Sequence, residues 1–396
     1  MTRHLSQFLV SALGLAVALT ACSSKQEEAG QAGAASAPGA AAQIVKIGFA
    51  APLTGPQAHY GKGYQNGVQL AIDDANAAKP TIAGKPVIFQ LVAEDDMADP
   101  KTATQVAQRI LDAGVAGMIG HFNSGTSIPA SKVYADAGIP QIAMATAPTL
   151  TQQGIKSVFR SLTSDIQQGS VMGQYVVEKL KAKKIAIIDD RTAYGQGLAD
   201  EFEKAAKTAG GNIVSREFTN DKASDFMAIL TSIKGKKPEV VFFGGTDAQS
   251  GPLVKQMRQI GLKATLVSGE MTRSDTFVKL AGDAAEGTIA SMAGMPLAQM
   301  PGGADFEKRF TARFGEPEIY SPYGYDSTRV MIAAMLKADS IEPAKYLPIL
   351  AGINYAGVTS PKISYDAKGD LESGGITVYK VTAGKWEVLE SIGGAQ

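Results

Sequence analysis

The chain has 396 residues, and its 38 Lys and Arg residues balance its 38 Asp and Glu residues. This neutral balance gives no electrostatic support to nucleic-acid binding. Cys22 is the only cysteine, which excludes an intramolecular disulfide and a cysteine metal cluster. The length exceeds what one ordinary hydrophobic core accommodates, so two lobes are expected.

The N-terminus has the pattern of a secretory signal peptide over residues 1–21. An apolar run from Phe8 to Leu19 is shorter than the roughly 20 residues that span a bilayer, and it ends on small residues. The quartet LTAC, which ends at Cys22, resembles the lipobox of bacterial lipoproteins. That resemblance implies cleavage before Cys22, acylation of its thiol, and a membrane-anchored lipoprotein in the periplasm.

Residues 22–43 are rich in Ala, Gly and Ser and lack apolar periodicity. We expect a flexible tether there. No second long apolar run follows, so the body of the protein is not expected to span the membrane.

Strand-like and helix-like segments alternate after the tether, in two consecutive sets. The first set has strands at 45–53, 87–92, 115–120 and 139–145, and helices at 63–78, 100–113 and 127–137. The second has strands at 184–189, 213–218, 240–243 and 265–267, and helices at 166–181, 201–209, 224–235, 249–260 and 274–281. This alternation predicts two similar α/β lobes, each with a parallel sheet covered by helices on both faces.

The C-terminal third mixes element types. Helices are expected at 305–314 and 325–338. Residues 376–381 and 385–389 are predicted to form the arms of a hairpin, with a three-residue turn at 382–384 that ends in glycine.

Two segments resemble enzyme motifs but do not match them. Residues 55–63 (GPQAHYGKG) place five residues between glycines where a phosphate loop has four. Residues 125–129 (GTSIP) have Pro129 where a nucleophile elbow has glycine. There is no Ser-His-Asp set with plausible spacing, and none of the three histidines is paired at metal-ligand spacing. We expect no catalysis, no cofactor and no metal.

One constellation favours ligand binding. The strand ending at Gly120 runs into a loop with the Ser124 and Thr126 hydroxyls, just before a helix, and amide groups at a helix start can hold a carboxylate. The next strand ends similarly at Thr146. Both loops follow the carboxyl ends of neighbouring parallel strands, where α/β sheets bind ligands. Turn and capping chemistry remains the alternative interpretation.

From about residue 44 to 369 the sequence resembles the periplasmic leucine/isoleucine/valine-binding proteins, which are substrate-binding lipoproteins of ABC transporters. The matching stretches are IGHFNSGTSIPAS (119–131), ATAPTLT (145–151), IAIIDDRTAYGQGLA (185–199), QIGLKA (259–264), AAEG (284–287) and YDAKGD (365–370).

The resemblance implies the type I periplasmic binding protein fold, with two Rossmann-like α/β lobes around a central ligand cleft. The N-terminal lobe would comprise residues 44–164 plus 295–371, and the C-terminal lobe 165–294 plus 372–396. Three crossovers would form the hinge. It also implies a monomer that closes on an amino acid and delivers it to an ABC permease in the inner membrane.

The resemblance further implies individual roles for residues in the cleft. Ser124 and Thr146 would hold the ligand carboxylate by hydroxyl and backbone amide, and Thr146 with the Met144 carbonyl would accept from its ammonium. Glu270 would pair with the ammonium from the second lobe. Tyr194 would close over the ligand.

Four more positions complete the expected site. Tyr60 and Tyr320 would form walls around the ligand side chain, and Asp165 would be an acid near the hinge. Thr246 stands where the family often has tyrosine, which leaves the specificity open. Leu, Ile and Val are the first expected ligands, while Ala, Thr, Phe, a small amide or a γ-amino acid remain alternatives.

Two other functions stay open at this point. A ligand sensor of the same fold could act through a signalling partner. A hydrolase working in the cleft is disfavoured by the missing catalytic set.

Overall fold

The computed structural model describes residues 41–393. The predicted signal peptide, the predicted lipidation site Cys22 and nearly all of the predicted tether lie outside the described residues. Within 41–393, no helix combines the length and the apolar character needed to cross a bilayer.

The first sheet has six strands in the order β2-β3-β1-β4-β5-β6. The strands are β1 (Gln43–Ala51), β2 (Thr81–Ile82), β3 (Lys85–Asp95), β4 (Gly117–Gly120), β5 (Gln141–Ala143) and β6 (Val158–Arg160). All pairs are parallel except that of the short β2 with β3. The strand order reverses between β1 and β4, which is where such sheets bind ligands.

The second sheet has seven strands in the order β13-β12-β11-β10-β9-β7-β8. They are β7 (Lys184–Asp189), β8 (Asn212–Phe218), β9 (Val240–Gly244), β10 (Thr265–Ser268), β11 (Ile289–Met292), β12 (Gly375–Thr382) and β13 (Lys385–Gly393). Strands β7 to β11 pair in parallel, whereas β12 and β13 add an antiparallel edge. The sheet is therefore mixed, and its order reverses between β7 and β9.

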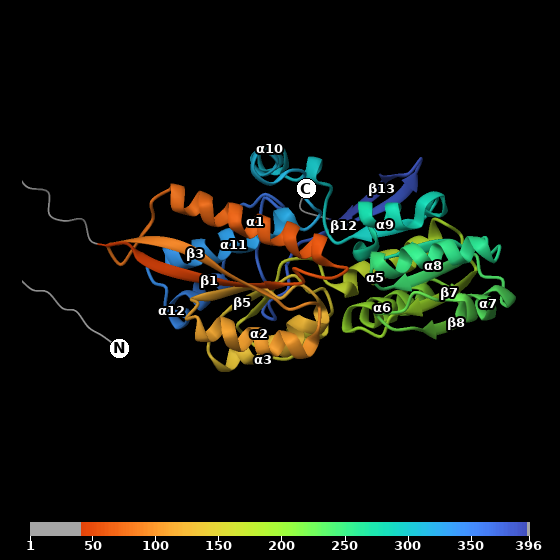
Figure 1. The fold of residues 1–396 in the computed structure, drawn as a ribbon, viewed down its shortest axis with the longest axis horizontal. Helices are drawn as coiled ribbons and strands as arrows, with labels where there is room; N and C mark the ends of the chain where they lie inside the picture. Colours follow the sequence, from red (N-terminus) through yellow and green to blue (C-terminus); the bar gives the residue numbers. More distant parts are fainter. Residues whose placement is uncertain (1–40, 394–396) are drawn as a thin grey trace, which may run out of the picture. The chain divides into compact units, whose positions relative to one another are not determined.

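Each sheet with its helices is called a lobe below (Figure 1). The first lobe carries α1 (Ala58–Ala77), α2 (Pro100–Asp112), α3 (Ser124–Asp136), α4 (Thr149–Gln152), α10 (Gly303–Phe314), α11 (Ser321–Lys337) and α12 (Pro343–Ala351). The second carries α5 (Asp165–Glu178), α6 (Ala193–Thr208), α7 (Met227–Gly235), α8 (Asp247–Gln259) and α9 (Asp275–Ala281). The chain passes between the lobes after β6, after β11 and before β12.

Local physics explains where the elements differ from expectation. The C-terminal hairpin is present, but Thr382 pairs with Lys385, so its loop has two residues and not three. Ala383 and Gly384 both have positive φ, as this tight turn requires. Helix α12 is an addition to the expected elements, and Pro348 inside it hides its periodicity. Helix α1 begins at Ala58, five residues before the expected start at 63.

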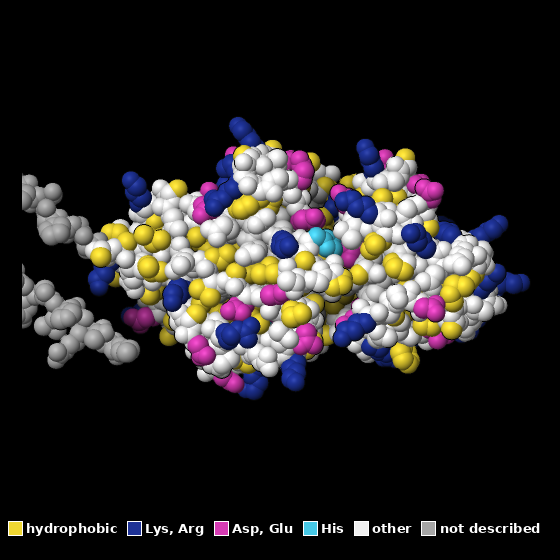
Figure 2. Space-filling view, viewed as in Figure 1, with side chains coloured by type: hydrophobic (Ala, Val, Ile, Leu, Met, Phe, Trp, Pro, Cys, Tyr) yellow, Lys and Arg dark blue, Asp and Glu magenta, His cyan; other side chains and the backbone are white. Residues whose placement is uncertain are grey.

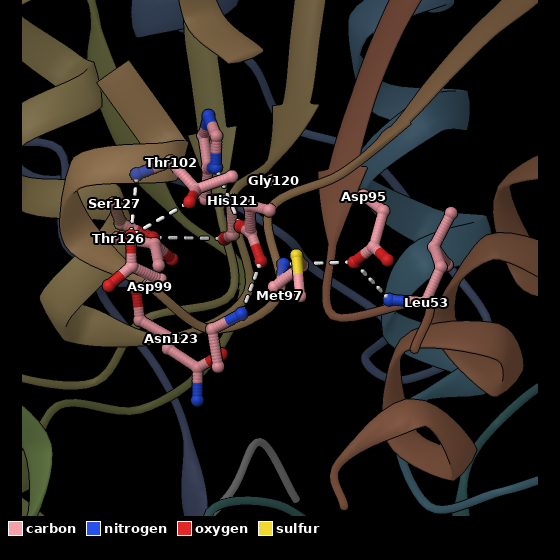
Figure 3. A network of polar contacts seen from close by, with 12 residues as sticks. Leu53, Asp95, Met97, Asp99, Thr102, Gly120, His121, Asn123, Thr126 and Ser127 are labelled. Carbon is pink, nitrogen blue, oxygen red and sulfur yellow. Dashed lines mark hydrogen bonds and ion pairs between the residues drawn. The ribbon is translucent and has the colours of Figure 1, made fainter. Parts of the chain in front are cut away.

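A polar network fixes the loops at the carboxyl edge of the first sheet (Figure 3). The Asp95 carboxylate accepts hydrogen bonds from the backbone amides of Leu53 (2.9 Å) and Met97 (2.8 Å), which ties the end of β3 to the loop after β1. The Ser127 hydroxyl donates to the His121 carbonyl (3.0 Å), which joins the loop after β4 to the first turn of α3. These contacts hold the edge on which the candidate ligand groups lie.

Helices α1 and α11 approach closely because glycines lie at their contact. A Cβ atom at Gly67 would overlap the Ser321 carbonyl oxygen, and one at Gly324 would lie 2.5 Å from the Tyr64 carbonyl oxygen. Gly67 lies inside α1, and its missing side chain allows this close packing. The packing positions the first turn of α1 at the junction of the lobes.

We predict that Gly67→Ala lowers the free energy of unfolding by about 1–3 kcal/mol, because the added methyl group has to displace backbone. Gly235→Ala is the matched control, since no heavy atom lies within 4 Å of a Cβ at that helical position. It should be neutral or stabilise by up to about 1 kcal/mol. Urea unfolding measures both, and equal stability of the two variants would contradict the packing argument.

Candidate functional site

A narrow cavity lies between the lobes, and both lobes contribute to its lining. Its polar lining residues are Asn123, Ser124, Thr146, Tyr194, Glu270 and Tyr320. Its apolar lining residues are Phe122, Met144, Ala145, Leu162 and Met271. The sequence-predicted residues Ser124, Met144, Thr146, Tyr194, Glu270 and Tyr320 therefore come together in one place.

The first lobe contributes a helix start and a strand end. Ser124 is the first residue of α3, and its hydroxyl oxygen accepts from the Ala147 amide at 3.2 Å. Thr146 follows β5, and its carbonyl accepts from the Asp165 amide at 2.9 Å. Because the free amides of the first turn of α3 carry partial positive charge, this end of the cavity suits an anionic group.

The second lobe contributes an aromatic ring and a carboxylate. Tyr194 lies in the first turn of α6, after β7, and Glu270 begins a short 3₁₀ helix (Glu270–Thr272) after β10. Both side chains are buried, and both follow the carboxyl ends of parallel strands. Among the described residues that line the cavity, none is Lys, Arg or His. This end of the cavity therefore suits a cation.

A second buried acid lies beside Glu270. The Gln168 amide nitrogen donates to a Glu270 carboxylate oxygen (2.5 Å) and to an Asp165 carboxylate oxygen (3.3 Å). The Ser291 hydroxyl donates to the Gln168 amide oxygen (3.0 Å), which fixes the orientation of that amide. One neutral amide thus bridges two acids.

Burial governs the protonation of this acid pair. It raises the pKa of Glu270 above its usual value. Burial also raises the pKa of Asp165 well above its usual value, and the nearby Glu270 charge raises it further. Neither acid has a cationic side chain within 4.0 Å among residues 41–393, so a cation from outside would restore their ionised forms.

Several buried polar atoms at the site have no partner within the part of the chain that the structure describes. They are the Tyr194 hydroxyl, the Asn123 amide oxygen and one Asp165 carboxylate oxygen. Buried polar groups are normally hydrogen-bonded, and leaving one unpaired costs about 1–3 kcal/mol. Of these atoms, the Tyr194 hydroxyl and the Asn123 amide oxygen belong to residues that line the cavity, so they offer unused hydrogen-bonding capacity to a polar ligand.

The remaining wall is apolar and aromatic. Phe122 and Tyr320 meet edge to face, with ring centroids 4.9 Å apart and an interplanar angle of 89°. Leu162 and Met271 complete the surface around them. Such a wall suits an apolar side chain on a ligand whose charged groups lie at the two polar ends.

Three sequence-predicted residues do not line the cavity. Asp165 lies behind it, next to Gln168. Tyr60 stacks near Phe122 (6.0 Å between centroids), and its hydroxyl donates to Asp247 (2.9 Å) in the other lobe. Thr246 is the N-cap of α8, where it forms a capping box with Gln249.

Sequence reasoning missed Gln168 and Asn123 as site residues. Gln168 lies three residues after Asp165 on α5, so both point to one face of that helix, which is the signal that could have found it. Asn123 precedes Ser124 within the loop whose hydroxyls indicated ligand binding, but its amide gave no separate signal.

Known proteins share this architecture. Residues 44–385 match the family described as periplasmic binding protein. The Leu/Ile/Val-binding protein homolog 1 of Brucella suis is 37% identical over 343 residues, covering 86% of this chain and 91% of the relative. An amino acid binding protein of Pseudomonas aeruginosa is 38% identical over 340 residues, which cover 85% of this chain and 90% of that protein.

Solved structures agree with the fold. The branched-chain amino acid transporter substrate-binding protein LivJ of Streptococcus pneumoniae, in complex with isoleucine, has a TM-score of 0.80 and 27% identity, covering 89% of this chain and all of that chain. The leucine-binding protein LivK of Thermotoga maritima has a TM-score of 0.81 and 25% identity, and the match covers 88% of this chain and 98% of that chain. With two Rossmann-like lobes around an internal cavity, this chain belongs to the periplasmic binding protein family.

Proposed function

We propose that this protein captures an amino acid with an apolar, branched side chain outside the cytoplasm and delivers it to an ABC importer. The observation that carries the proposal is a buried carboxylate, Glu270, facing a helix start at Ser124 across a cavity with apolar walls. The names of the relatives support the same ligand class, since they are Leu/Ile/Val-binding and branched-chain amino acid binding proteins.

The ligand would bind as a zwitterion. Its carboxylate would accept from the Ser124 hydroxyl and from amides at the start of α3 and at Thr146. Its ammonium would pair with Glu270 and donate to the Met144 carbonyl, while Tyr194 would cover it from the second lobe. Charge-assisted hydrogen bonds in a closed cavity supply both orientation and affinity.

Side-chain selectivity would come from Phe122, Leu162, Met271 and Tyr320, all of which line the cavity. Thr246, where the family often has tyrosine, is held in a helix cap and does not line it. A wider or more polar pocket therefore does not follow from that substitution. We accordingly favour Leu, Ile or Val over polar amino acids.

Transport would proceed by hinge closure of two lobes, residues 44–164 plus 295–371 and residues 165–294 plus 372–396. The ligand draws the lobes together because each lobe binds one of its charged ends. A monomer suffices, because one chain supplies both sides of the cavity. The partner would be a permease in the inner membrane that recognises the closed form.

The protein would act without catalysis. His121 and Asp96 contact each other (2.7 Å) as in a hydrolase, but the other ring nitrogen of His121 lies 3.1 Å from the Tyr134 hydroxyl, and all three residues are buried. The Ser127 hydroxyl donates to the His121 carbonyl and not to its ring. This pair supports the fold at the site and, within residues 41–393, has no accessible nucleophile to activate.

Calorimetric titration of residues 41–396, unfolded and refolded to remove bound ligand, tests the proposed function directly. The panel is the twenty amino acids with a few amides and γ-amino acids. We expect binding of Leu, Ile or Val with micromolar affinity, which corresponds to about −8 kcal/mol. No heat from any amino acid would refute amino-acid capture.

We predict that Glu270→Ala weakens binding of the preferred amino acid by about 2–5 kcal/mol, because the ammonium loses its partner inside the cavity. Glu270→Gln keeps the shape of the side chain and should also weaken binding. The exposed Glu286 offers a control, and Glu286→Gln should bind normally. Near-normal affinity of Glu270→Ala in the same titration would remove Glu270 from the site.

We also propose that a lipid on Cys22 anchors the protein to a membrane, since several acyl chains together hold a protein there effectively permanently. Cys22→Ser should abolish membrane retention and leave ligand binding intact. Fractionation of cells that express each form measures the first effect, and titration the second. A Cys22→Ser form that still sediments with membranes would contradict the anchor.

A further inference from the structure

The buried carboxylate of Asp247, at the start of α8, collects three donors on one oxygen. Its Oδ2 lies 2.9 Å from the Tyr60 hydroxyl, 2.9 Å from the His59 ring Nε2 and 2.6 Å from the Ser274 hydroxyl. Its other oxygen, Oδ1, has no partner among residues 41–393. Hydrogen bonds thus fix one oxygen of the carboxylate, whereas the other oxygen has none within these residues.

Two of these donors come from the opposite lobe. His59 and Tyr60 lie in the first turn of α1, in the first lobe, whereas Asp247 and Ser274 belong to the second. The Tyr60 hydroxyl also lies 3.0 Å from the carbonyl of Met271, a residue of the cavity wall. Any opening that parts the lobes at this junction would break these contacts.

His59 is the only basic side chain within 4.0 Å of the Asp247 carboxylate among the described residues. Its side chain is 22% exposed, so protons reach it from solvent, and Figure 2 shows histidine atoms at the surface beside acidic side chains. Closure therefore places a titratable, solvent-accessible ring against a buried acid of the other lobe.

The surroundings of His59 both raise and lower its pKa. Burial lowers the pKa of His59, but the hydrogen bond and charge of Asp247 and the charge of Glu318 outweigh it and raise that pKa above its usual value. Burial raises the pKa of Glu318, while the charges of His59 and Arg273 lower it and that of Asp275 raises it. Tyr60 stays protonated because burial raises its pKa well above the usual value.

We propose that His59, Tyr60 and Asp247 form a proton-dependent latch between the lobes, which contributes more to holding the ligand in mildly acidic than in mildly alkaline surroundings. The latch rests on the proposed function, because it regulates the same site. Opening separates His59 from Asp247 and returns the ring to its usual proton affinity.

The direction of the pH dependence follows from the coupling between proton binding by His59 and closure of the lobes. Since the closed form holds the His59 proton more tightly than the open form, the latch is complete below the open-form pKa and is lost as the pH rises through the closed-form pKa. Glu318 contributes in the same direction, because its partial burial in this arrangement of the lobes favours its protonated form. Glu270 contributes in the opposite direction, because it must ionise to pair with an ammonium.

Measuring ligand affinity at several pH values, in the unaltered protein and in variants, separates the contribution of His59 from those of the acids. The dissociation constant for L-leucine, or for the amino acid bound most tightly in the panel, is measured at pH 6, 7 and 8. We expect the ratio of affinity at pH 6 to that at pH 8 to be at least about twofold larger for the unaltered protein than for His59→Gln. Equal ratios for the two proteins would overturn the proton dependence.

Further variants test the contacts themselves. Tyr60→Phe removes one hydroxyl and should weaken binding by about two- to tenfold at every pH, with the proton dependence retained. Asp247→Asn keeps the shape of the side chain and should both weaken binding and abolish the His59-dependent ratio. Glu318→Gln should lower the ratio only in part, because the contact of His59 with Asp247 remains, and the exposed control Glu286→Gln should leave the ratio unchanged.

A second readout follows the protonation of His59 itself and does not rely on a measured affinity. Only His59 and His121 lie within residues 41–396, which form one compact unit, so the ring protons of the two histidines can be assigned in NMR spectra by the His59→Gln variant. Saturating leucine should raise the measured pKa of His59, and Asp247→Asn should abolish that rise. A His59 pKa that Asp247→Asn leaves unchanged would refute the latch, whereas absence of leucine binding alone would refute the proposed ligand.

Discussion

The site depends on two carboxyl groups that are buried between the lobes. Glu270 and Asp165 are both nearly inaccessible to solvent, share one amide of Gln168, and have no basic residue among the described residues of the cavity lining. Burying an ionised carboxylate without a partner costs several kcal/mol. A closed cavity with these acids ionised is therefore stable only when a cation fills it, which couples closure of the lobes to occupancy by the right ligand.

The fold places the complementary charge on the other lobe. In both sheets the functional loops follow the carboxyl ends of parallel strands next to the point where the strand order reverses. The first lobe presents the amide-rich start of α3, and the second presents Glu270. A zwitterion matches neither lobe alone. Because its two ends need opposite partners, it binds fully only when both lobes reach it, and a molecule with a single charge would leave one lobe unsatisfied.

Much of this arrangement was predictable from the sequence, and the exceptions have a common cause. The alternating segments predicted both α/β lobes, and local strand–loop–helix patterns indicated Ser124 and Thr146. Glu270 follows a short strand with no local signal, so only the resemblance to known binding proteins identified it. Gln168 bridges to a residue 102 positions away, and Tyr60 to one 187 positions away. Such contacts are set by the packing of whole lobes, which local patterns do not encode.

The two charged clusters at the junction respond to protons in opposite ways. Burial raises the pKa of Glu270 and Asp165, so an ammonium that enters the cavity releases protons, and its binding weakens as the pH falls. Closure of His59 onto Asp247 takes a proton up, and that contact strengthens as the pH falls. A protein with only the first cluster would lose its ligand in acid, and one with only the second would lose it in alkali. With both clusters in one closed form, the proposed latch would oppose the weakening of ligand binding in acid that the buried acid pair causes.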